Sequence, residues 1–228
     1  MKLAINKPAA LLISLILGLS ASTSYAQDKK IGFGLQASPN LSWMKSDDIK
    51  KIDNQGVRLG FGYGLMFDFR FGENYSLSTG LNVLNTSGKL KYLDTLEIPF
   101  THNGVKDTLP PATVTYKLMY VELPLHLLLK TNEIGYMKYF GQFGLSTQIK
   151  TKAKGDASLK NISGEDLSKE VFFLNLALSI GAGFEYSLGG NTALIVALIY
   201  NNGFSDILKD GDNKATFKSI TLKLGVMF

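Results

Sequence analysis

The residues best suited to acid–base chemistry are Glu122 and His126, four positions apart in the stretch Met119–Leu129. In an extended strand this spacing places both side chains on the same face. A histidine oriented by a carboxylate can act as a general base, and with a serine it would suit acyl hydrolysis. The other histidine, His102, has no identifiable serine partner. A lipid-modifying enzyme is therefore kept as an alternative, and we assign no catalytic residue.

Eight ionisable side chains share one placement, because each lies on the less apolar face of a segment that alternates between apolar and other residues. They are Arg58, Asp68, Arg70, Glu122, His126, Lys130, Glu185 and Lys223. If these faces point inward, the acids and bases can pair in a structural charge network that fills an interior. The open alternative is that the same charges line a selective or gated pathway.

The composition excludes several other kinds of chemistry. The chain has no Cys and two His in 228 residues, which rules out disulfides and thiolate metal sites and leaves too few ligands for an ordinary zinc site. The formal charge of +5 is mild, and no basic cluster indicates nucleic-acid binding. We expect no metal, no cofactor and no nucleic-acid partner.

The first 26 residues have the pattern of a secretory signal peptide. Lys2 and Lys7 precede an apolar stretch, Ala9–Leu19, and the small residues Ser24 and Ala26 mark a cleavage site before Gln27. The alternative is a membrane-spanning helix, but about 20 apolar residues are needed to cross a bilayer. The sequence thus predicts a signal peptide over residues 1–26 and one exported domain over residues 27–228.

The exported part alternates with period two, which is typical of β-strands. In Val57–Phe71 the odd positions are all apolar or aromatic, whereas the even positions hold glycine, Met66 and three charges. Pro39 interrupts the first segment and predicts a strand end, bulge or rim there. Many glycines lie on the less apolar faces and would leave some space inside. The predicted strands are Ile31–Trp43, Val57–Phe71, Tyr75–Val83, Met119–Leu129, Tyr139–Ile149, Phe172–Leu188, Thr192–Tyr200 and Ile220–Phe228.

The lengths of these segments and of their connections favour a membrane barrel over a soluble sandwich. The segments run to 9 residues or more, the length that a tilted strand needs to cross a bilayer. No charge lies on their apolar faces, and short connections alternate with long ones. The predicted fold is all-β: an eight-stranded, antiparallel, up-and-down transmembrane β-barrel in the outer membrane, with both termini in the periplasm.

Aromatic residues near the ends of the predicted strands indicate two interfacial girdles. The girdle at the short turns comprises Phe71, Tyr75, Tyr136, Tyr139, Tyr186 and Phe228. The girdle at the long loops comprises Trp43, Tyr116, Phe172 and Tyr200.

The order of several short motifs resembles the PorT-like outer-membrane β-barrel family of the Bacteroidetes. The matching stretches are Gly34–Ser42, Tyr120–Leu125, Gly181–Tyr186 and Tyr200–Phe204. The resemblance implies a fold and a location, and it adds one candidate role, as an accessory of type IX protein secretion with envelope or secretion proteins as partners. A terminal Phe228 after alternating apolar residues also looks like a substrate of the barrel assembly machinery.

The long connections are the remaining candidates for function, because loops carry function on rigid barrels. Asn103-Gly104 predicts a hairpin between Thr95–Phe100 and Val105–Leu109, either a protective ribbon or a partner-binding arm. The third loop, Thr151–Glu170, with the adjoining Lys150, mixes lysines and acids, and its lysines could meet lipopolysaccharide phosphates. We therefore expect an outer-membrane barrel with a side-chain-filled lumen that is not an enzyme and acts structurally or through its loops, in contact with outer-membrane lipid. A secretion accessory, a lipid-modifying enzyme and a narrow channel remain alternatives.

Overall fold

The computed structural model describes residues 30–46, 51–93, 96–102, 105–109, 111–158, 162–209 and 214–228. Of residues 96–102, 105–109 and 162 it describes the backbone. The predicted signal peptide and its cleavage site before Gln27 lie outside the described residues, as does the predicted Asn103-Gly104 turn.

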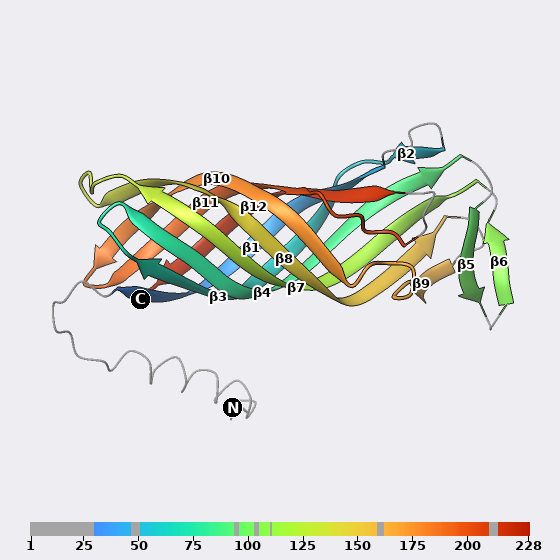
Figure 1. Ribbon diagram of the computed structural model, residues 1–228, viewed down its shortest axis with the longest axis horizontal. Helices are drawn as coiled ribbons and strands as arrows, with labels where there is room; N and C mark the ends of the chain where they lie inside the picture. Colours follow the sequence, from blue (N-terminus) through green and yellow to red (C-terminus); the bar gives the residue numbers. More distant parts are fainter. Residues whose placement is uncertain are drawn as a thin grey trace, which may run out of the picture.

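Eight antiparallel strands close into a ring, which confirms the predicted fold (Figure 1). Neighbouring strands of the ring pair in the order β1, β3, β4, β7, β8, β10, β11 and β12, and β12 pairs with β1. Closure leaves no unpaired edge in the ring. The strands are β1 (Ile31–Ser46), β3 (Arg58–Arg70), β4 (Tyr75–Tyr92), β7 (Thr113–Lys130), β8 (Met137–Ala157), β10 (Leu174–Gly189), β11 (Thr192–Gly203) and β12 (Ala215–Met227).

Four shorter strands lie together at one end of the barrel (Figure 1). This end, the loop end, carries β2 (Ile52–Asn54) beside β4 and β9 (Ile162–Asp166) beside β8. It also carries the hairpin of β5 (Leu96–His102) and β6 (Val105–Leu109), which confirms the predicted pairing in the second loop. The opposite end, the turn end, has the short connections, and there Gly189 and Gly190 take φ values of +98° and +61°.

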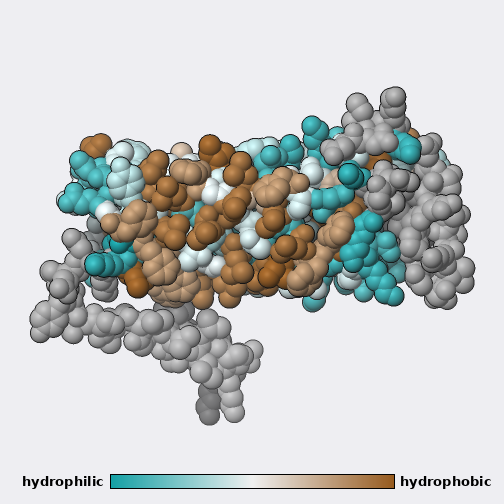
Figure 2. All heavy atoms as spheres, viewed as in Figure 1, coloured by the Kyte–Doolittle hydropathy of each residue, from teal (hydrophilic) through white to brown (hydrophobic). Residues whose placement is uncertain are grey.

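A broad apolar band covers the outside of the barrel (Figure 2). It forms because the apolar face of each strand points outward, where large side chains such as Leu81, Leu125 and Ile180 are at least half exposed. The small or polar faces point inward. A soluble protein would bury this apolar face, so the arrangement is that of a protein surrounded by lipid. None of the described residues forms a helix long and apolar enough to cross a membrane.

Several strands continue well past the apolar band at the loop end. β8 has 21 residues and β4 and β7 have 18 each, whereas a tilted strand crosses a bilayer in roughly 9–11. Beyond the band the two faces exchange character. On β4 the inward residues change from Ser76, Ser78 and Asn82 to Leu84, Leu90 and Tyr92, and the outward residues change from Leu77, Leu81 and Val83 to Lys89 and Lys91.

We call this part of the molecule the crown: the loop-end extensions of the strands, together with β2, β9 and the loops packed on them. It corrects the sequence prediction in two respects. The stretches after Val83 and Ile149 were expected to be loops, but they continue as β4 and β8. Tyr116 was expected in the outer girdle, but it points inward and is 1% exposed. Both differences follow from the exchange of faces beyond the band.

Aromatic residues occupy the girdle at the turn end as predicted. Phe71 stacks on Tyr75 with ring centroids 6.5 Å apart, and Tyr136 lies 6.3 Å from Tyr186. All four side chains are exposed. At the loop end Trp43 contacts Tyr200, with centroids 6.4 Å apart. These pairs mark the two borders of the apolar band.

Pro39 was expected near a strand end, bulge or rim, and it lies instead in the interior of β1. Pro39 still pairs with Phe61 of β3. On the other side, Ala37 and Asn40 pair with β12, and the two residues between them, Ser38 and Pro39, do not. Because proline has no N–H, it can interrupt one ladder without shifting the register of the other.

Several inward glycines leave no space, contrary to the sequence expectation, whereas Gly62 lines the cavity described below. A Cβ atom added at Gly64 or Gly144 would collide with the carbonyl oxygen of the neighbouring strand, at Leu81 and Leu125 respectively. Glycine at these positions lets adjacent backbones approach closely, which a narrow, strongly curved barrel requires.

Candidate functional site

A cluster of ion pairs lies in the lumen near the turn end. The Nζ atom of Lys130 on β7 lies 2.7 Å from Asp68 Oδ2 on β3 and 2.6 Å from Glu185 Oε1 on β10. The side chain of Lys130 is 5% exposed and that of Asp68 2%. Arg70 Nε lies 3.7 Å from Asp68 at the more exposed edge of the same group. We call Asp68, Arg70, Lys130 and Glu185 the ionic cluster.

The remaining predicted lumen charges lie elsewhere. Glu122 and Lys223 line the middle of the barrel. Arg58 is half-buried at the loop-end start of β3 and has no ion pair within the described part of the chain. The structure therefore brings four of the eight residues into one cluster and places Glu122, His126 and Lys223 around the cavity described below.

Hydrogen bonds link the polar side chains in the middle of the lumen. The Glu122 carboxylate accepts bonds from Asn82 Nδ2 at 3.2 Å and from Gln148 Nε2 at 3.0 Å. On the other side, Ser179 donates to Asn201 Oδ1 at 2.6 Å, and Asn201 Nδ2 donates to Thr221 Oγ1 at 3.2 Å. These bonds satisfy buried polar groups from six different strands, as a packed polar interior requires.

His126 contacts a serine but not a carboxylate. Its Nε2 atom lies 3.3 Å from Ser146 Oγ, and its Nδ1 atom faces Gln142 Nε2 at 3.3 Å. A Ser–His–acid triad needs an acid at Nδ1 to orient the ring and stabilise its protonated form. Glu122 does not take that position, because its oxygens bind the amides of Asn82 and Gln148. The geometry thus builds a hydrogen-bonded histidine inside the barrel and not a triad.

A cavity of about 40 Å³ lies among these mid-barrel residues. Its lining includes Gln36, Glu122, His126, Asn201 and Lys223. That volume is enough for about three water molecules. Among the described residues, no group of three or more His, Cys, Asp or Glu side chains could hold a metal ion.

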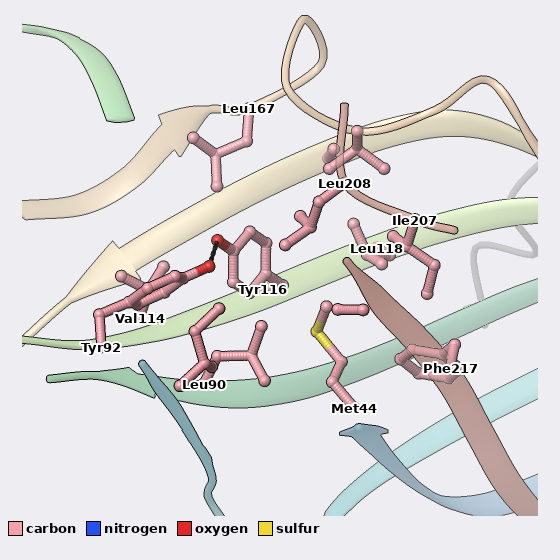
Figure 3. Packing of buried hydrophobic residues seen from close by; sticks show 14 of the residues in the cluster. Met44, Leu90, Tyr92, Val114, Tyr116, Leu118, Leu167, Ile207, Leu208 and Phe217 are labelled. Atoms are coloured by element: carbon pink, nitrogen blue, oxygen red, sulfur yellow. Dashed lines mark hydrogen bonds between the residues drawn. The ribbon is translucent and has the colours of Figure 1, made fainter. Parts of the chain in front are cut away.

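The crown encloses a cluster of buried apolar side chains at the loop end of the barrel, which we call the plug (Figure 3). The plug consists of fully or almost fully buried side chains from several strands and loops. Its members include Met44, Ile52, Leu90, Tyr92, Val114, Tyr116, Leu118, Tyr120, Leu167, Val171, Ile207, Leu208 and Phe217. The hydroxyl groups of Tyr92 and Tyr116 point at each other within it, 2.6 Å apart.

Loop segments contribute to the plug and are tied to the strands by backbone bonds. Ile207 donates its N–H to Ala215 O at 2.9 Å, and Leu208 pairs with Val171 in an isolated bridge. Lys150 turns inward and donates from Nζ to the carbonyl oxygens of Ser168, at 2.6 Å, and Val171. Lys150 was grouped with the third-loop lysines that could meet lipopolysaccharide phosphates, but it points inward, so this is a further correction.

The sequence analysis missed the plug as a whole, although a signal for it was present. Lys89-Leu90-Lys91-Tyr92 and Thr113–Leu118 both alternate with period two, but with the charged or hydroxyl residue outward. Polar residues outward and apolar residues inward are typical of a strand that surrounds an apolar core in water. Inside a membrane the two faces are reversed. A sequence prediction that follows only the alternation with apolar residues outward therefore ends each strand at the membrane border.

Comparison with proteins of known structure finds matches at low identity. Neisserial surface protein A is 13% identical, with 87% of this chain and 96% of that chain aligned and a TM-score of 0.49. Ail of Yersinia pestis is 14% identical over 87% and 97% of the two chains, with a TM-score of 0.41. The outer membrane protease OmpT of Escherichia coli is 10% identical over 92% and 99%, also with a TM-score of 0.41.

Among curated proteins, none matches the sequence. The sequence model of one protein family does match, over residues 25–209, which is most of the chain. That family is described as the outer membrane protein beta-barrel domain. Its match agrees with the closed eight-stranded ring and the outward apolar band. The chain therefore belongs to the family of outer-membrane β-barrel domain proteins, and its place is the outer membrane.

Proposed function

We propose that this protein is a closed, non-enzymatic outer-membrane barrel that holds a rigid crown at the cell surface and acts through the contacts of that crown. The observation that carries the proposal is the plug. A barrel that served only to anchor itself would need no packed core beyond the membrane. Here buried side chains from β4, β7 and β8 and from two loops order the crown, and a rigid scaffold is what a binding loop requires.

The lumen supports the same proposal. The ionic cluster occupies the turn end and the plug occupies the loop end, with a cavity of about 40 Å³ between them. This arrangement favours a filled barrel over a narrow channel. The histidine without an acid partner, enclosed in the lumen, likewise argues against a lipid-modifying enzyme.

The proposal places the crown outside the cell and both termini in the periplasm. The contrast in connection length supports this orientation, since outer-membrane barrels have short periplasmic turns and longer external loops. The chain has no Cys, so single cysteines can report the orientation. Lys91→Cys on the crown should react with a membrane-impermeant maleimide on intact cells, and Asn191→Cys at the turn end should react only after the outer membrane is opened. The reverse pattern would overturn the orientation.

A second role, as an accessory of type IX secretion, follows from the sequence resemblance to PorT-like barrels. It would use periplasmic or inner-membrane partners, and so it would place the working surface at the turn end. Site-specific photo-cross-linking in cells separates the two roles, with the cross-linker at Lys91 on the crown or at Glu133 in a turn. Adducts at Lys91 support the crown proposal. Adducts confined to Glu133, together with lost export on deletion of the gene, would replace it.

Insertion through the barrel assembly machinery remains part of the proposal. Phe228 is outward and half exposed, and its N–H donates to Phe33 O at 2.7 Å beside the last strand. An exposed terminal aromatic next to the closing strand pair would be accessible to such a machine before the barrel closes.

A further inference from the structure

We propose that the outward face of the crown on β4, β7 and β8 binds the phosphate groups of a glycolipid headgroup in the outer leaflet. The inference rests on the proposed orientation of the crown and goes beyond the proposed function by naming a ligand and its residues. Five lysines define the surface, which we call the lysine surface: Lys89, Lys91, Lys117, Lys152 and Lys154.

The strand register makes these lysines neighbours. Lys117 on β7 lies directly opposite Lys154 on β8, and Lys152 lies opposite Met119, one outward position further along β7. On the other side of β7, Ser87 of β4 is opposite Lys117, so Lys89 lies diagonally beside Lys117. Side chains directly opposite or diagonal on one face of a sheet are within reach of each other. Lysines from three strands thus form one continuous basic surface.

The surface keeps an excess of positive charge. Within the described part of the chain, three acids adjoin the five lysines: Lys117 pairs with Asp156, the exposed Asp53 of β2 lies opposite Lys91, and Asp166 lies opposite Lys154 with its carboxylate bound to the Ser168 N–H at 2.8 Å. Among the described residues, Lys117 is the member of the lysine surface that has an ion pair. Like charges directly opposite each other in a sheet destabilise it. An anion between Lys117, Lys152 and Lys154 would relieve that repulsion.

A single bulge creates the surface. Gln148 and Lys150 of β8 point inward, and simple alternation would turn Lys152 and Lys154 inward too. The register shifts at this point, where Met119 and Tyr120 of β7 pair with Lys152 and Lys150, so that Thr151 is the extra residue. Thr151 closes the bulge by donating its hydroxyl to Met119 O at 3.0 Å. Beyond it, Ala153 and Ala157 face the plug, and Lys152 and Lys154 face out.

The position of the surface identifies its ligand. On the same outward faces, the first residues of the apolar band towards the turn end are Ile149 on β8, just before the bulge, Val121 on β7, beyond Met119, and Val83 on β4, with Ser87 and Asn85 between it and Lys89. Figure 2 shows hydrophilic residues directly beyond that band at the loop end. Lysines at the border of a hydrocarbon layer lie at the level of lipid headgroups, where they attract anionic groups. With the crown outside, the anionic headgroup at this level is the phosphorylated sugar of an outer-leaflet glycolipid.

The test measures binding of bisphosphorylated lipid A, and of the same lipid without phosphates, to the full protein in detergent micelles. The variant Lys152→Gln/Lys154→Gln removes the two lysines that the bulge turns outward. The matched control, Lys45→Gln/Lys218→Gln, removes two lysines of the same barrel end on β1 and β12. The variant Lys152→Arg/Lys154→Arg keeps the charge. All six substitutions replace side chains that point outward on the crown, so folding, checked by the heat-dependent shift in gel mobility, should be unchanged.

We expect Lys152→Gln/Lys154→Gln to weaken binding of the phosphorylated lipid at least tenfold. The arginine variant and the β1/β12 control should stay within twofold of the parent, and the dephosphorylated lipid should bind weakly to every variant. Equal losses in the glutamine variant and the control would show general charge attraction and overturn the proposal. So would full binding by the glutamine variant, or equal binding of the dephosphorylated lipid. This binding assay in micelles does not depend on the orientation of the protein in the membrane. A wrong orientation would therefore show in the cysteine labelling and not in this assay, so the two proposals can fail independently.

Discussion

Within the described part of the chain, Lys130 is the residue of the ionic cluster that bridges two carboxylates. Its Nζ atom contacts both Asp68 and Glu185, and all three side chains are largely buried. Taking one partner from a buried ion pair leaves an uncompensated charge, which costs more than the pair itself contributes. The stability of the barrel should therefore depend strongly on this one amine.

We predict that Lys130→Gln lowers the free energy of unfolding by about 3–5 kcal/mol. Urea titration of the protein folded into lipid vesicles measures this. The control is Lys138→Gln, whose contact with Glu133 at 3.5 Å joins two side chains that are each more than a third exposed. An exposed pair of this kind is worth about 0–1 kcal/mol. Equal costs for the two variants would contradict the description of the ionic cluster.

Asp156 supplies a pH-dependent contact in the crown. The hydrogen bond from the Lys117 ammonium is the largest cause that lowers the pKa of the Asp156 carboxyl. Burial opposes it in part, and the Gly164 N–H, at 2.9 Å, lowers the pKa further. Because folding lowers this pKa, the contact stabilises the crown above the unfolded value of about 3.9. That stabilisation is lost as the pH falls through the folded pKa.

Titration of the Asp156 carboxyl by carbon NMR tests this directly. Lys117→Gln should raise the pKa of Asp156 towards its ordinary value, since it removes the largest cause of the shift. Lys91→Gln, which removes a more distant charge of the lysine surface, should leave the pKa nearly unchanged. A normal pKa in the parent protein would show that the two side chains do not meet in solution.

At the scale of single elements, β4 crosses two environments along one face. Leu81 lies outward within the apolar band, and Asn85 lies outward on the same strand at its border. An arginine on the lipid face costs about 2–4 kcal/mol at mid-membrane and about 0–1 near the interface. We predict this difference between Leu81→Arg and Asn85→Arg, measured by unfolding in vesicles. If Leu81→Arg were as stable as Asn85→Arg, the assigned position of the band would be wrong.

The bulge in β8 offers a test of the crown as an element. Thr151 is the extra residue, so deleting it should remove the bulge and bring Lys152 directly after the inward Lys150, where simple alternation keeps Lys152, Lys154 and Asp156 outward. Charges without partners are not tolerated in an apolar interior, and none enters it here, so the crown should keep its order. Hydrogen exchange in β9 and at Ile207–Leu208 should match that of the parent protein, as it should in β11 next to Ile195. Thr151→Ala, which keeps the extra residue, is the control, and a rise in exchange confined to the crown of the deletion variant would contradict the prediction.

Elements inside the membrane could be predicted from the sequence, and those outside it could not. Lipid demands an unbroken apolar face, so segments such as Val57–Phe71 show a strict pattern. Beyond the border the same strand must be polar outside and apolar inside, so its pattern reverses at residues such as Leu84 and Asn85. The reversal resembles a strand end when each segment is read alone.

The inward charges were predictable as a set, but their pairing was not. Alternation assigns Asp68, Lys130 and Glu185 to one interior. Which of them meet depends on the stagger of β3, β7 and β10 around the ring, and no local sequence feature specifies that stagger. For the same reason the sequence placed His126 beside Glu122, whereas the structure gives His126 a serine from β8 and Glu122 amides from β4 and β8.

At the scale of the whole molecule, the protein has a part that lies in the membrane and a part, the crown, that lies beyond it. In the membrane part, polar side chains point into the lumen around a small cavity in its middle. Outside the membrane the same strands wrap a dry core and carry the loops, including the β5–β6 hairpin, at the far end of the molecule (Figure 1). A filled barrel leaves recognition to its outer surfaces, the crown among them.

The central claim is that the lumen is closed, and single-channel recording in planar lipid bilayers tests it most directly. With the protein inserted from detergent and salt on both sides, we predict no discrete current steps at either polarity. Insertion is verified in the same bilayers by fluorescence from a label at Lys91→Cys. Reproducible steps of one amplitude from the inserted parent protein would contradict the account, because neither the ionic cluster nor the plug could then fill the lumen as described.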